Sequence, residues 1–240
     1  REVVLRAMRS AESSDSSTVS QWRRLIGLRE TPATNSGRAE ITLGSSQARR
    51  AALGLAAMAW LTYQYREAES WLDALLATSG LQSGLTPSAW VVRGEVASSQ
   101  AQLQEADSAF ATAVELSRQG GSSWAQAWAL IRLANVRGRL SGDPTVSAAL
   151  LARAEPLLKS DDDFLRGQFH CVRAGNDPSG TWTAEADARA GMELAEKAGI
   201  QRLYASCLHV LASDQLQRGR TNEALATFWE EQEIQEAIGD

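Results

Sequence analysis

Cysteine and histidine are both scarce in this sequence, with two of each among 240 residues. Two cysteines cannot build the disulfide framework of a small secreted domain, so we expect free thiols in a reducing compartment. His170 is next to Cys171, and His209 is two residues from Cys207. On a helix such close neighbours point in different directions, so neither pair can chelate a metal or act as a Cys–His nucleophile alone. The two pairs together could form such a site only through a helix crossing that the sequence does not specify, so we expect structural roles for these four residues.

The sequence also lacks the features of several other protein classes. Five prolines and few alternating Val, Thr or Tyr residues argue for helices over strands, as does the Ala-, Leu-, Glu- and Arg-rich body. No apolar run approaches the ~18 residues of a membrane span and no secretory signal pattern is visible, so we expect a cytoplasmic protein without a membrane partner. The net charge of −5 argues against a nucleic-acid partner, which would need an excess of Lys and Arg.

Motifs for catalysis are missing as well. The glycines follow neither the GxxxxGK[ST] nor the GxGxxG order of phosphate-binding loops, and there is no GxSxG or HExxH. The adjacent aspartates Asp161, Asp162 and Asp163 lack the spacing by which a wrapped loop surrounds a cation, whereas acidic residues at a helix start stabilise the helix dipole. We therefore expect a helix to start here, and no catalytic residue, cofactor or metal in the chain. An enzyme with an unrecognised carboxylate pair stays open as an alternative.

What the sequence does contain is a pair of helices, between Ser88 and Gln119, with small and large residues at regular offsets. Spacings of three and four residues place side chains on one helix face. A small residue opposite a large ring lets two antiparallel helices approach closely. One face of the first helix carries Trp90, Gly94 and Ala97, and one face of the second carries Ala106, Phe110 and Ala113.

This pattern resembles the tetratricopeptide repeat. Related residues recur along the chain: Ala68 lies 38 residues before Ala106, and Ala224 lies 118 residues after it. The resemblance implies about five antiparallel helix pairs over 47–240, stacked into a right-handed α-solenoid. The expected pairs are 47–63 with 66–78, the two helices of 88–119, those of 123–158, those of 160–198, and a last pair that contains Leu208 and Phe228. The period exceeds the standard ~34 residues, which suggests the repeat regions of large bacterial regulators and signal-transducing ATPases.

Residues 1–46 precede the repeats. We expect two short helices over 2–11 and 19–28, placed to cap the first pair, because terminal repeats expose an apolar face. From Arg29 to Ser46 the Pro-, Thr-, Asn-, Gly- and Ser-rich composition indicates a loop. The chain begins with Arg1 instead of Met, and it ends at Gly239-Asp240, where a helix has just stopped. We therefore interpret it as a piece of a larger protein.

The resemblance also implies where a ligand binds. In the family the first helix of each pair lines a concave groove, and the corresponding positions here are Trp60, Val91, Glu95, Ser98, Trp128, Ile131, Asn135, Ser206, His209 and Ser213. These residues make a mixed apolar and polar groove, which suits a protein or peptide segment or a small-molecule effector. Five arginines form either a basic strip or a solvated face paired with acids: Arg49, Arg50, Arg132, Arg137 and Arg139.

From these observations we expect a non-catalytic domain that binds a protein or a ligand. It would be the sensor or interaction part of a larger bacterial regulatory or signalling protein, such as a transcription regulator, and it would contact neighbouring domains of its parent chain. The alternative is a passive scaffold or adaptor that holds the subunits of a multiprotein assembly.

Overall fold

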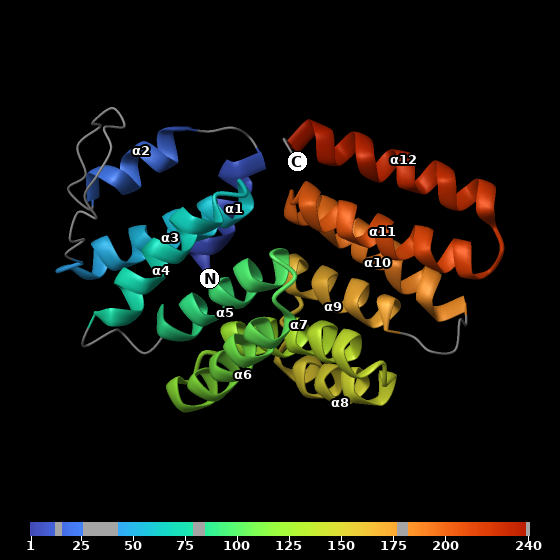
Figure 1. The fold of residues 1–240 in the computed structure, drawn as a ribbon, viewed down its shortest axis with the longest axis horizontal. Coiled ribbons are helices and arrows are strands. Elements are labelled where there is room, and N and C mark those ends of the chain that lie inside the picture. Colours follow the sequence, from blue (N-terminus) through green and yellow to red (C-terminus); the bar gives the residue numbers. More distant parts are fainter. Residues whose placement is uncertain (13–15, 26–42, 79–84, 177–181, 239–240) are drawn as a thin grey trace.

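The computed structural model describes residues 1–12, 16–25, 43–78, 85–176 and 182–238. Over these ranges every regular element is a helix, which confirms the all-α prediction (Figure 1). In chain order the elements are α1 (Glu2–Glu12), α2 (Ser16–Leu25), α3 (Ser46–Leu61), α4 (Tyr65–Ala77), α5 (Leu85–Ser99), α6 (Leu103–Gly120), α7 (Ser123–Ser141), α8 (Pro144–Ala154), the 3-10 turn η1 (Glu155–Leu157), α9 (Asp163–Gly175), α10 (Trp182–Ala198), α11 (Gln201–Gln217) and α12 (Thr221–Ile238).

The expected boundaries agree with these elements to within a few residues. Most of the predicted loop of residues 29–46, the end of the helix expected over 19–28 and the final Gly239-Asp240 lie outside the described residues. Within the described part, residues 43–45 precede α3 and are not helical.

Side-chain caps and left-handed glycines set several helix ends. The Ser45 hydroxyl accepts a hydrogen bond from the Ala48 amide at the start of α3, as serine does at the N-cap position. Asp162 caps α9 in the same way, with its carboxylate accepting from the Leu165 amide at 3.2 Å. The prediction that Asp161–Asp163 starts a helix is therefore confirmed. Gly199 follows α10 at a φ of +67°, a conformation that glycine adopts without strain.

The contact between Gly94 and Phe110 holds α5 and α6 together as the sequence predicts. A Cβ atom added at Gly94 would lie 2.5 Å from Cε1 of Phe110, a distance at which no side chain fits. Phe110 itself is fully buried. The Phe110 ring thus occupies the space that a side chain at position 94 would fill, which allows the two helices to pack closely.

Each helix from α3 to α12 contacts the next one in the chain, and α1 and α2 pack on α3. The main core cluster runs from Val4 in α1 to Cys207 in α11. Val4 and Met8 of α1 are buried in it, and Trp22 of α2 lies against the bare Cα of Gly54 on α3. The two N-terminal helices therefore cover α3 and share its core.

The two cysteines form a disulfide, which corrects the expectation of free thiols. Cys171 of α9 and Cys207 of α11 have Cα atoms 5.2 Å apart, and both are buried. Gly191 of α10 lies against the two sulfurs, and a Cβ there would come within 2.9 Å of Cys207 Sγ. The prediction of free thiols was wrong because 36 residues separate the cysteines in the sequence, and only the packing of three helices brings them together.

Figure 1 shows the helices following an arc, with α1–α4 on one side, α6 and α8 at its lowest part, and α9–α12 on the other side. Contacts between distant parts of the chain close this arc. Arg202 of α11 donates to the Tyr63 hydroxyl at 2.5 Å and to the Leu61 carbonyl at 2.9 Å. Its guanidinium also lies 4.8 Å from the Tyr63 ring centroid, within the range of a cation–π contact. At the N-terminus, Arg1 pairs with Asp162 at 3.4 Å.

Replacing Arg202 by methionine should open the arc. Methionine keeps much of the side-chain volume but removes the donors to Tyr63 and Leu61, which lie 139 and 141 residues away. We expect the radius of gyration, about 18 Å for a compact chain of this length, to rise by roughly 1 Å in small-angle X-ray scattering. Arg189→Met is the control, because the ion pair between Arg189 and Glu185 lies within α10. Equal radii for wild type and Arg202→Met would show that this contact does not hold the arc closed.

Candidate functional site

A cavity of about 510 Å³ lies between α7, α9, α11 and α12, and we call it the inner cavity. Each of the four helices presents residues at helical spacing, so that one face of each helix lines it. Its polar and charged lining residues come from all four helices. They are Arg132, Asn135 and Arg139 of α7; Gln168 of α9 and its C-cap residue Asn176; Arg202, Ser206 and His209 of α11; and Glu231 and Gln235 of α12. Cys171 of the disulfide also forms part of its wall.

A buried carboxylate anchors the α7 side of the inner cavity. Glu95 of α5 is 3% exposed, and its Oε1 atom lies 2.8 Å from Nε of Arg132. The same oxygen accepts a hydrogen bond from Nε1 of Trp128 at 3.1 Å. Burial raises the pKa of Glu95, while the charge of Arg132 and the two contacts act in the opposite direction. The arrangement holds the Arg132 side chain, only 18% exposed, in a fixed position at the cavity wall.

On the opposite wall a second carboxylate is already engaged. Glu231 of α12 is buried, and one of its oxygens lies 3.2 Å from Nδ1 of His209. Its other oxygen accepts a hydrogen bond from the Gln235 amide at 2.9 Å. The His209 ring also packs edge-on against Phe228 at 5.7 Å. These contacts join α11 to α12 and engage both oxygens of Glu231, the one acidic residue among the described lining residues.

Three of the groove residues expected from the family resemblance lie together at this cavity. Asn135 comes from α7, and Ser206 and His209 come from α11. Three of the five arginines of the expected strip lie in two different surroundings. Arg132 and Arg139 line the cavity, whereas Arg137 pairs with Asp107 at 2.6 Å, as the solvated-face interpretation expects.

Four other expected groove residues are buried and offer no groove surface. Val91, Trp128 and Ile131 are fully buried, and Glu95 is nearly so. The ring of Trp128 packs against Trp124 at 5.1 Å and against Phe164 of α9 at 5.5 Å. The expectation was wrong for these positions because α7 packs directly against both α5 and α9, so large side chains on the facing surfaces fill the core.

The remaining three expected residues lie elsewhere. Trp60 is half-buried and donates its Nε1 hydrogen to the Ser99 hydroxyl at 3.0 Å, which links α3 to α5. Ser98 and Ser213 are also half-buried. None of the three is among the residues that line the inner cavity.

Sequence reasoning missed the contributions of Arg202, Gln168, Glu231 and Gln235. The family resemblance assigns the groove to the first helix of each expected pair. It therefore gives no groove residue on α12, which corresponds to the second helix of the last expected pair. A usable signal existed for Arg202, because it lies four residues before Ser206 and seven before His209, on the same helix face. No comparable signal pointed to α12.

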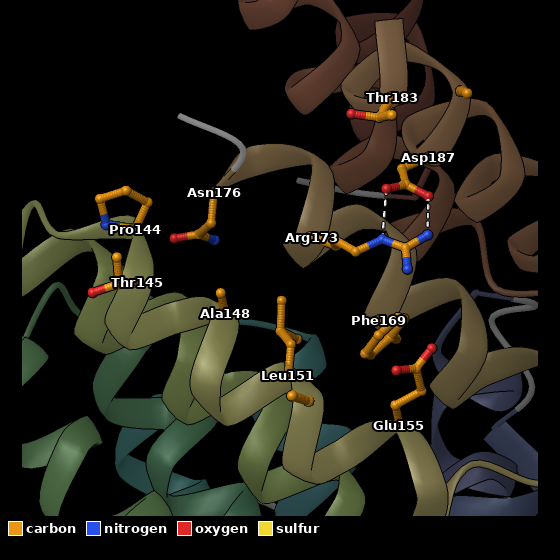
Figure 2. Close-up of a pocket in the computed structure, with 12 residues that line it drawn as sticks. Pro144, Thr145, Ala148, Leu151, Glu155, Phe169, Arg173, Asn176, Thr183 and Asp187 are labelled. Atoms are coloured by element: carbon orange, nitrogen blue, oxygen red, sulfur yellow. Dashed lines mark hydrogen bonds and ion pairs between the residues drawn. The ribbon is translucent and has the colours of Figure 1, made fainter. Parts of the chain in front are cut away.

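A second, more apolar cavity of about 710 Å³ lies between α8, α9 and α10, and we call it the outer groove. Figure 2 shows Ala148 and Leu151 of α8 facing Phe169 and Arg173 of α9 across it. The groove exists because α8 makes few contacts with α9 and ends at the 3-10 turn that contains Pro156.

An ion pair forms the α9–α10 wall of the outer groove. Nε of Arg173 lies 2.6 Å from Oδ2 of Asp187, and Nη2 of Arg173 donates a second hydrogen bond to Oδ1 of Asp187 (Figure 2). Nδ1 of His170 lies 3.0 Å from Asp187. Burial acts to raise the pKa of Asp187, but the hydrogen bonds from Arg173 and His170 outweigh it, and the net effect lowers this pKa. The pair ties α9 to α10, and the groove beside it is lined by apolar side chains such as Leu151 and Phe169 together with polar ones such as Thr145 and Thr183.

Within the described ranges, no group of three or more His, Cys, Asp or Glu side chains is arranged to hold a metal ion. None of the described helices combines the length and the apolar character that crossing a membrane requires. Comparison with models of known protein families and with curated proteins gives no match to this chain.

Proposed function

We propose that the chain is a non-catalytic binding domain built as a right-handed α-solenoid of tetratricopeptide-like helix pairs. Its role would be the sensor or interaction part of a larger bacterial regulatory or signalling protein. The contacts support pairing, because α3 packs on α4, α5 on α6, α7 on α8, α9 on α10 and α11 on α12. First helices also contact the first helix of the next pair, from α3 to α11, as stacked repeats do.

Hydrogen bonds within the last pair support an antiparallel arrangement. Gln215, near the end of α11, accepts from Thr227, near the start of α12. His209, further back along α11, is bonded to Glu231, further along α12. Residue numbers therefore rise on one helix as they fall on the other.

The observation that carries the binding proposal is the inner cavity. Its volume of about 510 Å³ lies within the ~300–1,000 Å³ typical of small-molecule sites. Polar side chains from four helices converge on it, and three of them stand at positions that the family uses for binding. The cavity would accept a small-molecule effector or a short segment of a partner protein.

Filling the inner cavity should abolish binding without disturbing the fold. Ser206 lines the cavity and is exposed, so Ser206→Trp places a large ring there at low cost to the core. A ligand found by thermal-shift screening at ~100 times its Kd stabilises the wild type by about 2.7 kcal/mol, or roughly 5–10 °C for a chain of this size. We expect this shift to disappear in Ser206→Trp and to persist in Ser108→Trp, an exposed position on α6. Equal shifts in both variants would contradict the proposal.

A scaffold role is the second candidate, and a specific surface favours it. Leu225 and Trp229 lie one turn apart on α12 and are 53% and 63% exposed. Exposed apolar residues of this size often mark protein contacts. If the scaffold role is the correct one, Trp229→Ala removes partner binding and Ser206→Trp does not; the sensor role predicts the reverse.

A further inference from the structure

We infer that the inner cavity binds a small anionic molecule through a phosphate or carboxylate group. The inference rests on the proposed binding function, and it specifies the chemistry of the ligand.

The charges around the cavity point to an anion. Its described lining residues include three arginines, Arg132, Arg139 and Arg202, and one acid, Glu231. The buried Glu95 pairs with Arg132 from behind the wall, and the arginines still outnumber these two acids. This local excess of positive charge stands in a chain whose net charge is −5. A concave site lined by one sign of charge concentrates ligands of the opposite sign.

Two of the arginines are held in place before any ligand arrives. Nε of Arg132 is fixed at Glu95, which Trp128 holds in turn. The Arg202 guanidinium is stacked on the Tyr63 ring and bonded to its hydroxyl. These contacts, with the bond from Arg202 to the Leu61 carbonyl, hold both guanidinium groups in place. Pre-positioned donors avoid the entropic cost of ordering long side chains on binding.

The acidic and neutral residues of the cavity fit the same ligand. The two oxygens of Glu231 already contact His209 and Gln235, so this carboxylate is held against side chains of α11 and α12. The Asn135 amide and the Ser206 hydroxyl, which also line the cavity, can donate further hydrogen bonds to phosphate or carboxylate oxygens. The volume of about 510 Å³ suits a small molecule, whereas a nucleic-acid chain would need an extended basic surface.

Substitution of Arg139 tests whether the positive charge of the inner cavity contributes to anion binding. Arg139 lines the cavity and is exposed, so Arg139→Gln removes one positive charge without breaking the buried Glu95–Arg132 pair. Arg153→Gln is the matched control, because Arg153 is an exposed residue of α8 outside the cavity. Both variants change the net charge of the chain equally, so only a local effect distinguishes them.

The experiment is a calorimetric titration of the purified chain at low ionic strength, with inorganic pyrophosphate in one arm and citrate in the other. We expect one equivalent of at least one anion to bind the wild type. Affinity should fall about tenfold in Arg139→Gln, as expected for loss of a charged hydrogen bond. It should be unchanged in Arg153→Gln and lost in Ser206→Trp. Binding of pyrophosphate alone would identify a phosphate site, and binding of citrate alone a carboxylate site.

The inference is overturned if neither anion binds, if Arg139→Gln and Arg153→Gln behave alike, or if binding survives Ser206→Trp. Its failure can be distinguished from failure of the proposed function. A retained molecule that Ser206→Trp releases, but that is neutral and insensitive to Arg139→Gln, refutes the anionic ligand and leaves the binding function standing.

Discussion

Replacing Phe110 by alanine lowers the free energy of unfolding by about 3–5 kcal/mol. The ring is fully buried, and it fills the space that Gly94 leaves on the facing helix. Alanine leaves a void that no neighbouring side chain can fill, because Ala106 and Ala113 on the same helix face are already buried at the interface. Urea denaturation followed by circular dichroism measures the change.

The control for this prediction is Gln104→Ala, at an exposed position of the same helix. Surface substitutions of this kind change stability by less than about 0.5 kcal/mol. A loss of under 1 kcal/mol in Phe110→Ala would mean that α5 and α6 do not depend on this contact, and the packing account of the pair would fail.

Reducing the disulfide between Cys171 and Cys207 lowers the free energy of unfolding by roughly 3–4 kcal/mol. The cross-link joins residues 36 apart in the sequence, and it stabilises the fold by restricting the unfolded chain. It also connects α9 to α11 directly at the wall of the inner cavity. Denaturation with and without a phosphine reductant gives the difference.

A double variant, Cys171→Ala with Cys207→Ala, supplies the control for the reductant. Its stability should match that of the reduced wild type and should not respond to the phosphine. Titration of thiols in the unreduced protein provides the decisive check, because the disulfide predicts none. Two free thiols in protein purified without reductant would contradict the structure at this point.

Local packing could be predicted from the sequence because it depends on residues close together along the chain. The offsets of Gly94, Ala106 and Phe110 specify how two neighbouring helices meet, and the structure confirms that contact. The start of α9 at Asp162 and the left-handed Gly199 after α10 follow from the backbone chemistry of single residues.

Features that join distant helices could not be predicted in this way. The disulfide depends on the register between α9 and α11, and the Arg202–Tyr63 contact spans 139 residues. Tyr63 adopts a φ of +57° just after α3, a conformation that is uncommon for residues other than glycine. No pattern in the sequence marks it as the partner of an arginine on α11.

The candidate site likewise combines features that the sequence predicts with features that it does not. The family resemblance predicts groove positions for Asn135, Ser206 and His209, and these residues line the inner cavity. Trp128 and Ile131 occupy comparable places but are fully buried, because how closely α5, α7 and α9 approach decides which positions face outward. The offset pattern in the sequence predicts which residues share a helix face, whereas their exposure depends on how closely neighbouring helices approach.

The most direct test of the binding function is a parallel pull-down from lysate of the source cells. The wild-type chain, Ser206→Trp and Ser108→Trp serve as baits, and mass spectrometry identifies both proteins and small molecules that each retains. If the inner cavity is the binding site, at least one molecule is retained by the wild type and by Ser108→Trp and is lost from Ser206→Trp. Identical retention by all three baits would contradict the claim that the inner cavity is the binding site.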